Sequence, residues 1–375
     1  MKKFWDKWTE IALVKRILVG LILGAILGIA VPQATGIAIL GDVFVSALKA
    51  IAPLLVFFLV ISSLCNAGKS HGGVIKTVII LYMFSTVLAA VIAVFASMAF
   101  PVKMTLANAA TDTSAPQGIV EVLNNLLLNV VANPVSSLVN ANYVGILMWA
   151  VLLGLAFRAA DKMTKKVLAD VADGISMVVT WIINLAPFGI FGLVFNTVST
   201  NGLDIFTTYG KLLLLLVGCM LFIYFVTNPL LVYWCIRQNP YPLIFHCLKR
   251  SALTAFFTRS SAANIPVNMK VCEEMGLDRD TYSVTIPLGA TINMDGAAIT
   301  ITVMTMATAF TLGIHVDIPT AIILSLLAAL SACGASGVAG GSLLLIPMAC
   351  SLFGISDDIS MQVVAVGFII GVVQD

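Results

Sequence analysis

The stretch Pro287-Leu288-Gly289-Ala290-Thr291-Ile292-Asn293-Met294-Asp295-Gly296 lies inside a long apolar segment, Ser283–Ile314. It puts the carboxylate of Asp295 at membrane depth, with no lysine or arginine within one helical turn. A carboxylate there must be paired, protonated or bound to a cation. The neighbouring amide and hydroxyl oxygens, and backbone carbonyls freed by unwinding at the glycine, favour a hard cation such as sodium. A structural hydrogen-bond cluster around a neutral Asp295 and a proton-coupled carboxylate remain as alternatives.

The composition places the chain in a membrane. Of its 375 residues, 60% are hydrophobic and 10% are charged, and the mean hydropathy is +1.06. Soluble domains carry about 25% charged residues, so most of this surface cannot face water. The net charge of +2 gives no sign of a nucleic-acid partner. The seven cysteines form no C-x-x-C pair, which indicates reduced packing residues and neither disulfides nor a zinc site.

Long apolar segments supply the membrane-crossing helices, each of which needs about 20 predominantly apolar residues. The segments that meet this length are Ile11–Pro32, Ile39–Ala67, Val74–Pro101, Val144–Ala160, Ile175–Ser199, Tyr209–Ile236 and Ser283–Ile314. With a cytoplasmic N-terminus and two later segments that enter and leave on one side, most of the 20 Lys and Arg residues become cytoplasmic. The positive-inside rule therefore predicts a polytopic all-α protein with its N-terminus in the cytoplasm.

The first re-entrant segment, Leu243–Met269, has the polar centre Thr258-Arg259-Ser260-Ser261-Ala262-Ala263-Asn264. In a straight helix Arg259 would lie deep in hydrocarbon, at a cost of about 2.5–3.5 kcal/mol on insertion scales. Two half-helices that meet at a Ser-Ser tip in a wet cavity avoid this cost. Basic residues flank both ends, which predicts a hairpin that enters from the cytoplasm. The alternative is a slightly polar spanning helix whose serines bond back to the preceding turn.

The second re-entrant segment, Ile318–Phe353, is interrupted at residues 332–342 by the sequence ACGASGVAGGS. Asp317 precedes it and Asp357 follows it, without a basic residue at either end, which predicts entry from outside. The glycines let the tip unwind and present carbonyl oxygens to a ligand. A helix-packing face of small residues is the alternative. Paired interruptions in opposed orientations favour a transporter site at the interface of inverted repeats.

In the third span, Ser85 and Thr86 follow Tyr82 and can add hydroxyl ligands to the expected cation. The chain contains no low-complexity linker, so residues 1–375 are predicted to form a single integrated membrane domain. The final apolar run, Met361–Asp375, is too short to span. The last helix is therefore expected to be truncated in this sequence.

Taken in order, these motifs resemble the dicarboxylate/amino acid:cation symporters, the glutamate-transporter-like family, and most closely the bacterial sodium/serine-threonine symporters. The resemblance covers nearly the whole chain and is carried by Thr258–Ser261, Pro287–Gly296 and Gly334–Gly341. It implies eight transmembrane helices plus two re-entrant helical hairpins of opposite orientation, built as inverted repeats. It also implies a homotrimer in the bacterial inner membrane, with residues 1–240 mainly scaffold and residues 241–375 as the transport core.

The resemblance further implies which residues bind substrate and sodium, with the outer hairpin as the gate. Those implied for substrate are Arg259, Ser260, Ser261, Ala335, Ser336, Gly337, Val338 and Asp375, the last at the position that recognises the substrate amino group. Those implied for one sodium are the Gly289 carbonyl, Asn293 and Asp295 with Tyr82, Ser85 and Thr86. Those implied for another sodium are Thr291 and Met294 with carbonyls of Ala332, Cys333 and Ala335.

The implied function is sodium-coupled import of small neutral L-amino acids, serine and threonine, by alternating access. Arg259 leaves open acidic amino acids or dicarboxylates, coupled to sodium or protons, because it can pair with a substrate carboxylate or with protein groups. The chain departs from the family pattern at Ala262, Ala297 and Ala339, and these positions bear on the substrate.

Two other classes of protein are weighed against transport. Gly334-Ala335-Ser336-Gly337 fits the nucleophile pattern of an intramembrane serine protease, but a serine needs a general base and no histidine follows Ser336. Glycine-rich re-entrant loops also occur in channels. Two hairpins of opposite entry with a buried carboxylate favour alternating access, so we expect a transporter and not an enzyme.

Overall fold

The computed structural model describes residues 13–66, 73–104, 106, 127–128, 130–202, 204–252, 255–256, 261–333 and 340–370. Every regular element in this part of the chain is a helix. Five of its helical stretches are long and apolar enough to cross a membrane, namely Thr35–Asn66, Lys76–Ala99, Lys162–Asn184, Thr207–Ile236 and Thr281–Thr311. The predictions of an all-α chain and of several membrane-crossing helices are thereby confirmed.

The first part of the chain consists mainly of long helices. Their bounds are α2 (Leu13–Ala30), α3 (Ala38–Asn66), α4 (Gly73–Ala99), α6 (Pro134–Val139), α7 (Tyr143–Ala156), α8 (Lys162–Asn184), α9 (Ala186–Asn201), α10 (Asp204–Phe222) and α11 (Asn228–Ile236), with the short turns η1 (Thr35–Ile37), η2 (Phe157–Ala159) and η3 (Ile223–Thr227). Because η3 is a π-helical turn between α10 and α11, these three elements form one continuous rod.

The predicted span Ile175–Ser199 is wrong in its bounds, because two helices share this sequence. α8 starts earlier, at the N-cap Asp161, whose side chain accepts a hydrogen bond from the Thr164 N–H at 2.8 Å. α9 starts afresh after Leu185 with Pro187 in its first turn. A proline has no N–H to continue the preceding helix, so the first helix ends there.

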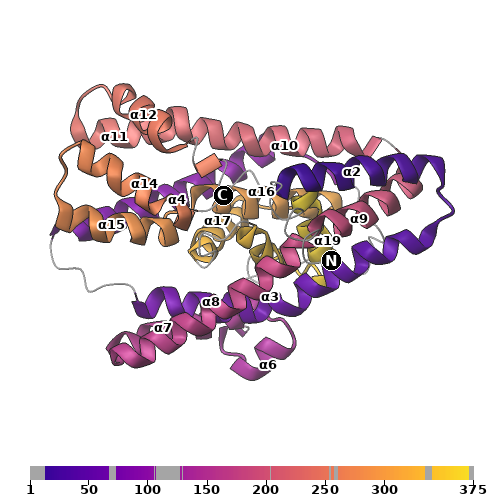
Figure 1. The fold of residues 1–375 in the computed structure, drawn as a ribbon, viewed down its shortest axis with the longest axis horizontal. Coiled ribbons are helices and arrows are strands. Elements are labelled where there is room, and N and C mark those ends of the chain that lie inside the picture. The colour runs from indigo at the N-terminus through magenta and orange to yellow at the C-terminus, as the bar shows by residue number, and fades with distance from the viewer. Residues whose placement is uncertain are drawn as a thin grey trace, which may run out of the picture.

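Glycines let α2 pack directly on the backbone of α9. A Cβ added at Gly24 would lie 2.6 Å from the Phe191 carbonyl oxygen, and one at Gly28 would lie 3.0 Å from that of Phe195. The Gly-x-x-x-Gly spacing aligns these residues on one helix face, a pattern that supports close helix contacts in membranes. Figure 1 shows α2 and α9 side by side at one end of the molecule.

The second part of the chain contains shorter and interrupted helices. Their bounds are α12 (Tyr241–Cys247), η4 (Leu248–Ala252), α14 (Ser261–Glu274), α15 (Arg279–Ile292), α16 (Asp295–Thr311), α17 (Ile318–Ala332), η5 (Gly341–Leu345), α18 (Ile346–Ser351) and α19 (Asp357–Ile369). The arms of both expected hairpins lie against each other: α14 contacts η4, and α17 contacts η5 and α18. Of the inner Ser-Ser tip only Ser261, the first residue of α14, is described, and residues 334–339 of the outer tip lie outside the described residues.

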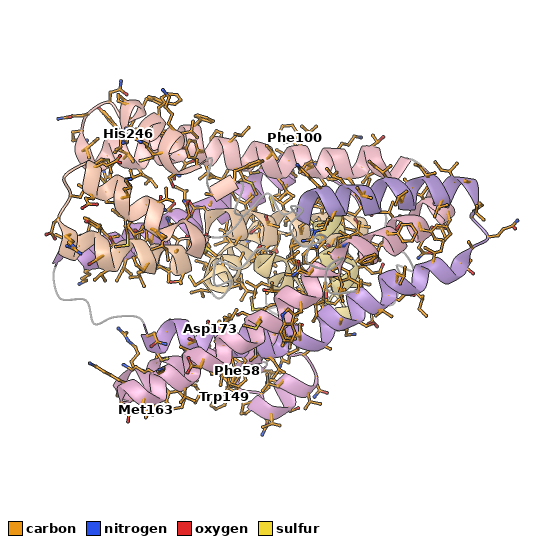
Figure 2. All side chains as sticks on the ribbon, viewed as in Figure 1. Phe58, Phe100, Trp149, Met163, Asp173 and His246 are labelled. Atoms are coloured by element: carbon orange, nitrogen blue, oxygen red, sulfur yellow. The ribbon has the colours of Figure 1, made fainter. Side chains whose placement is uncertain are left out.

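α16 forms the centre of the molecule, and its residues Ala297–Ala309 are all buried. It packs against α4, α10, α17 and α18. In Figure 1, α16, α17 and α19 occupy the middle, between α10 on one side and α3 on the other. Side chains fill the space between these ribbons (Figure 2). The N-terminal end of α16 is thus held deep inside the protein, where α4 and α15 meet it.

Candidate functional site

The segment predicted to carry the site is a helix broken in its middle. α15 ends at Ile292 and α16 begins at Asp295. Between them, Asn293 (φ −104°, ψ 77°) and Met294 (φ −115°, ψ 58°) leave the helical conformation. The unwinding expected at Gly296 therefore occurs just before Asp295. Such a break frees carbonyl groups in the last turn of the first helix for a ligand.

Two hydroxyl groups of α4 converge on the carboxylate at this break. The Ser85 hydroxyl donates to Asp295 Oδ2 at 2.7 Å, and Thr86 Oγ1 lies 3.1 Å from Asp295 Oδ1. Thr86 Oγ1 is also 3.0 Å from the Tyr82 carbonyl oxygen and 3.3 Å from Asn293 Oδ1. One hydroxyl hydrogen can serve only one of these three acceptors at a time. The group of Tyr82, Ser85, Thr86, Asn293 and Asp295, named here the Asp295 cluster, is thus rich in oxygen and suited to a cation.

The amide of Asn293 can satisfy the Asp295 cluster in two ways. With its oxygen turned inward, it adds a further acceptor next to Thr86 Oγ1. With the amide turned over, its nitrogen donates to Asp295 Oδ1 at 3.2 Å and to the Tyr82 carbonyl at 3.3 Å. The first orientation presents the amide oxygen to a bound cation. The second places an N–H donor among the oxygens of the cluster, which satisfies them when no cation is bound.

Gly289 allows α15 to approach α4 at the cluster. A Cβ at Gly289 would lie 2.9 Å from both Cζ and the hydroxyl oxygen of Tyr82. The Tyr82 hydroxyl donates to the Thr285 carbonyl at 3.3 Å, which ties the same two helices together. This contact keeps the Tyr82 carbonyl next to the cluster.

The second group of expected sodium ligands is only partly described. The Cys333 thiol lies 3.6 Å from the Ile292 carbonyl, so the end of α17 meets the break between α15 and α16. Ala332 and Met294 are buried close to this junction along the chain. The Thr291 hydroxyl donates to the Leu288 carbonyl at 2.8 Å, within its own helix. Thr291 is therefore bonded within α15 and is not part of the Asp295 cluster.

Several expected site residues lie outside the described residues, and the structure places none of them. They are Arg259, Ser260, Ala335, Ser336, Gly337, Val338 and Asp375.

A cavity of about 320 Å³ separates the first hairpin from α15. The residues that line it are Tyr82, Ser251, Ala255, Ser261, Asn264, Asn268, Ile286, Gly289, Ala290 and Asn293. Of these residues, Ser261 was predicted from the sequence to bind substrate, whereas no role was predicted for Ser251, Asn264 or Asn268. A signal was present, because Ser261, Asn264 and Asn268 are spaced i, i+3 and i+7 and so share one face of α14.

A family model described as "Sodium:dicarboxylate symporter family" matches residues 13–374. The chain belongs to this symporter family. Among similar proteins, "Serine/threonine transporter SstT" of Bifidobacterium adolescentis is 58% identical over 99% of this chain and 86% of its own length. The proteins of that name from Streptococcus thermophilus LMG 18311 and Streptococcus agalactiae A909 are 55% and 57% identical over 100% of this chain and 94% of theirs. The resemblance inferred from the motifs is confirmed.

Family membership decides between transport and catalysis. The chain is a multi-pass membrane protein of a symporter family and not an enzyme. A serine protease would need a histidine as its general base, and the position of His246 does not favour that role. His246 lies at the α11–α12 end of the molecule (Figure 2), whereas α17 and α18, which flank the proposed nucleophile, lie near the centre (Figure 1).

Proposed function

We propose that the protein is a sodium-coupled symporter that imports serine and threonine by alternating access. The observation that carries the sodium coupling is the Asp295 cluster, in which Ser85 and Thr86 of α4 meet the carboxylate at a helix break. The names of the relatives at 55–58% identity support serine and threonine as substrates. Serine and threonine have no second carboxylate, so their binding site needs no cationic side chain to pair with one.

In this mechanism the Asp295 cluster binds the co-transported sodium. Asp295 supplies the negative charge, while Thr86, Asn293 and the Tyr82 carbonyl supply neutral oxygens. The last turn of α15 adds the negative end of a helix dipole. Binding draws α4 and α15 together at the break, which favours the closed arrangement of the outer hairpin over substrate. The sodium gradient then drives inward movement.

We further propose the fuller architecture implied by the family: eight transmembrane helices, two opposed hairpins, a homotrimer, and a bacterial inner membrane with the N-terminus in the cytoplasm. The packing supports a division into two parts, with two additions to the second part. α2, α3, α7, α8 and α9 pack mainly among themselves, while α4 packs against α15, α16 and α17, and α10 packs against α4 and α16. We therefore assign α4 and α10 to the transport core of residues 241–375, with the rest of residues 1–240 mainly scaffold.

The remaining implied residues complete the proposal. Ser260 and Ser261 of the inner tip and the 335–338 backbone of the outer tip hold the substrate, with Asp375 on its amino group. Thr291, Met294, Ala332, Cys333 and Ala335 hold a second sodium. Arg259 serves protein groups near the inner tip.

The acidic-substrate alternative is favoured by the family's description, which names dicarboxylates. Uptake of labelled serine into proteoliposomes, with and without an inward sodium gradient and with glutamate as competitor, separates the two. Sodium-driven serine uptake that excess glutamate leaves intact supports the neutral symporter. Sodium-driven glutamate uptake without serine uptake would assign Arg259 to the substrate carboxylate and overturn the neutral reading.

A further inference from the structure

A polar chain inside the inner hairpin leaves one buried oxygen without a partner. Asn264 Nδ2 donates to Ser251 Oγ at 2.7 Å, and the Ser251 hydroxyl donates in turn to Asn268 Oδ1. In this arrangement the Asn264 amide nitrogen faces Ser251. The amide oxygen is the remaining acceptor, and within the described part of the chain it has no hydrogen-bond partner, although Asn264 is only 3% exposed. A buried carbonyl oxygen in this situation is free to accept a hydrogen bond from water or to bind a cation.

The cavity next to this oxygen is built from neutral oxygen-bearing groups. Ser251, Ser261, Asn268 and Asn293 line it together with Asn264, and among the described residues none that lines it carries a charge. The unpartnered Asn264 oxygen carries a partial negative charge and would repel an anion in this cavity. Divalent cations are held by carboxylates in proteins, and the lining offers none. Hydroxyl and amide oxygens alone suit a monovalent hard cation.

The cavity and the Asp295 cluster share a wall. Asn293 lines the cavity and also lies 3.3 Å from Thr86 Oγ1 within the cluster. Its amide therefore separates two oxygen-rich spaces and can present its oxygen to one of them at a time. Arg250, which precedes the lining residue Ser251 in the chain, forms an ion pair with Glu274 at 3.4 Å that joins the two arms of the hairpin. The ion pair lies at the end that the basic flanks predict to be cytoplasmic.

We propose that Asn264 Oδ1 is part of an additional, weaker sodium site, separate from the two sodium sites proposed above, which receives the ion from the Asp295 cluster on its way to the cytoplasm. This site rests on the proposed sodium coupling and deepens it. The inner hairpin then binds substrate at its tip and also contributes an intermediate binding site for the co-transported ion. The ligand set consists of the Asn264 oxygen with hydroxyl and amide groups of the same cavity.

Sodium-dependent thermal unfolding of the purified full-length protein tests this site, with choline replacing sodium at constant ionic strength. The titration is made in an Asp295→Asn background, which weakens the first site. Adding Asn264→Leu should then raise the sodium concentration needed for half of the remaining stabilisation by about tenfold. Asn264→Asp should lower it by about tenfold, because it replaces a neutral ligand with a charged one of the same shape.

Thr302→Val is the matched control, because it also removes a buried oxygen without a hydrogen-bond partner, in α16 and away from the cavity lining. It should leave the sodium titration unchanged. Equal titrations for Asn264→Leu, Asn264→Asp and their Asp295→Asn parent would show that the cavity holds water only and would overturn the proposal. An Asn264-dependent response to serine without sodium would also overturn it. In both cases a wild-type protein that still takes up serine with sodium keeps the proposed function intact, whereas sodium-independent uptake would refute that function.

Discussion

Thr86 offers the sharpest test of the Asp295 cluster, because its oxygen is the point where the cluster's acceptors meet. It lies 3.0 Å from the Tyr82 carbonyl, 3.1 Å from Asp295 Oδ1 and 3.3 Å from Asn293 Oδ1. Valine has the shape of threonine without the oxygen. Thr86→Val therefore removes one cation ligand and one hydrogen-bond donor to the carboxylate while filling the same buried space.

The size of the effect follows from the kind of contact that is lost. A hydrogen bond to a charged group contributes about 1.5–3 kcal/mol. Each 1.4 kcal/mol is a tenfold change in an equilibrium constant, so sodium affinity should fall by roughly 10- to 150-fold. Thr86→Ser keeps the hydroxyl and should retain sodium affinity to within about threefold, the scatter expected of such contacts.

The assay is serine uptake into proteoliposomes as a function of external sodium. Half-maximal activation should move to much higher sodium in Thr86→Val, with uptake recovering at saturating sodium. Thermal unfolding measured in high sodium without serine checks that the variant is folded. A shift in half-maximal sodium of less than threefold in Thr86→Val, or equal shifts in the valine and serine variants, would refute the assignment of this oxygen to the sodium site.

Three further outcomes follow from contacts elsewhere. Gly24→Val should destabilise the protein by about 1–3 kcal/mol through overpacking, because a Cβ there would lie 2.6 Å from the Phe191 carbonyl; thermal unfolding measures this, and an unchanged midpoint would contradict the packing of α2 on α9. Lys49→Ala should change stability by less than about 1 kcal/mol, because both side chains of the 2.6 Å Lys49–Asp358 ion pair are exposed at the protein surface; a larger loss in thermal unfolding would show a role beyond the pair itself. Gly340→Ala should cost about 1–2 kcal/mol, since residue 340 has φ +77°; uptake and thermal unfolding together check it, and a fully stable variant would contradict this backbone conformation.

The sequence predicted the break in the core helix because its physical cause is local. A carboxylate in an apolar run needs polar partners. With Asn293 two residues before Asp295, a helix that unwinds there satisfies both side chains better than a continuous helix does. The two hydroxyls of α4 could be proposed as partners for the same reason, since Ser85 and Thr86 are polar residues at membrane depth. The exact position of the break was not predictable from Gly296, because packing against α4 determines which residues unwind.

Other features depend on contacts between distant segments and had no such local signal. Apolar content alone could not divide residues 162–201 into α8 and α9, because both helices are apolar enough and only the proline marks the boundary. Ser251 could not be linked to Asn264 and Asn268 without knowing how the hairpin arms align. The spacing of the two asparagines indicated a shared helix face, but not that this face meets α15 across a cavity.

The position of Cys333 suggests a route by which sodium at the Asp295 cluster, as proposed, would act on the outer hairpin. Its thiol contacts the Ile292 carbonyl, the last of α15, and it lies at the end of α17, where the first arm of that hairpin leads to its tip. A cation that draws Thr86 toward Asp295 fixes the conformation of Asn293, one residue after Ile292. The Cys333–Ile292 contact carries the same displacement to the end of α17. In the proposed mechanism, coupling between ion and gate therefore needs no long pathway, because the helix break at Asn293 and the end of α17 are in direct contact.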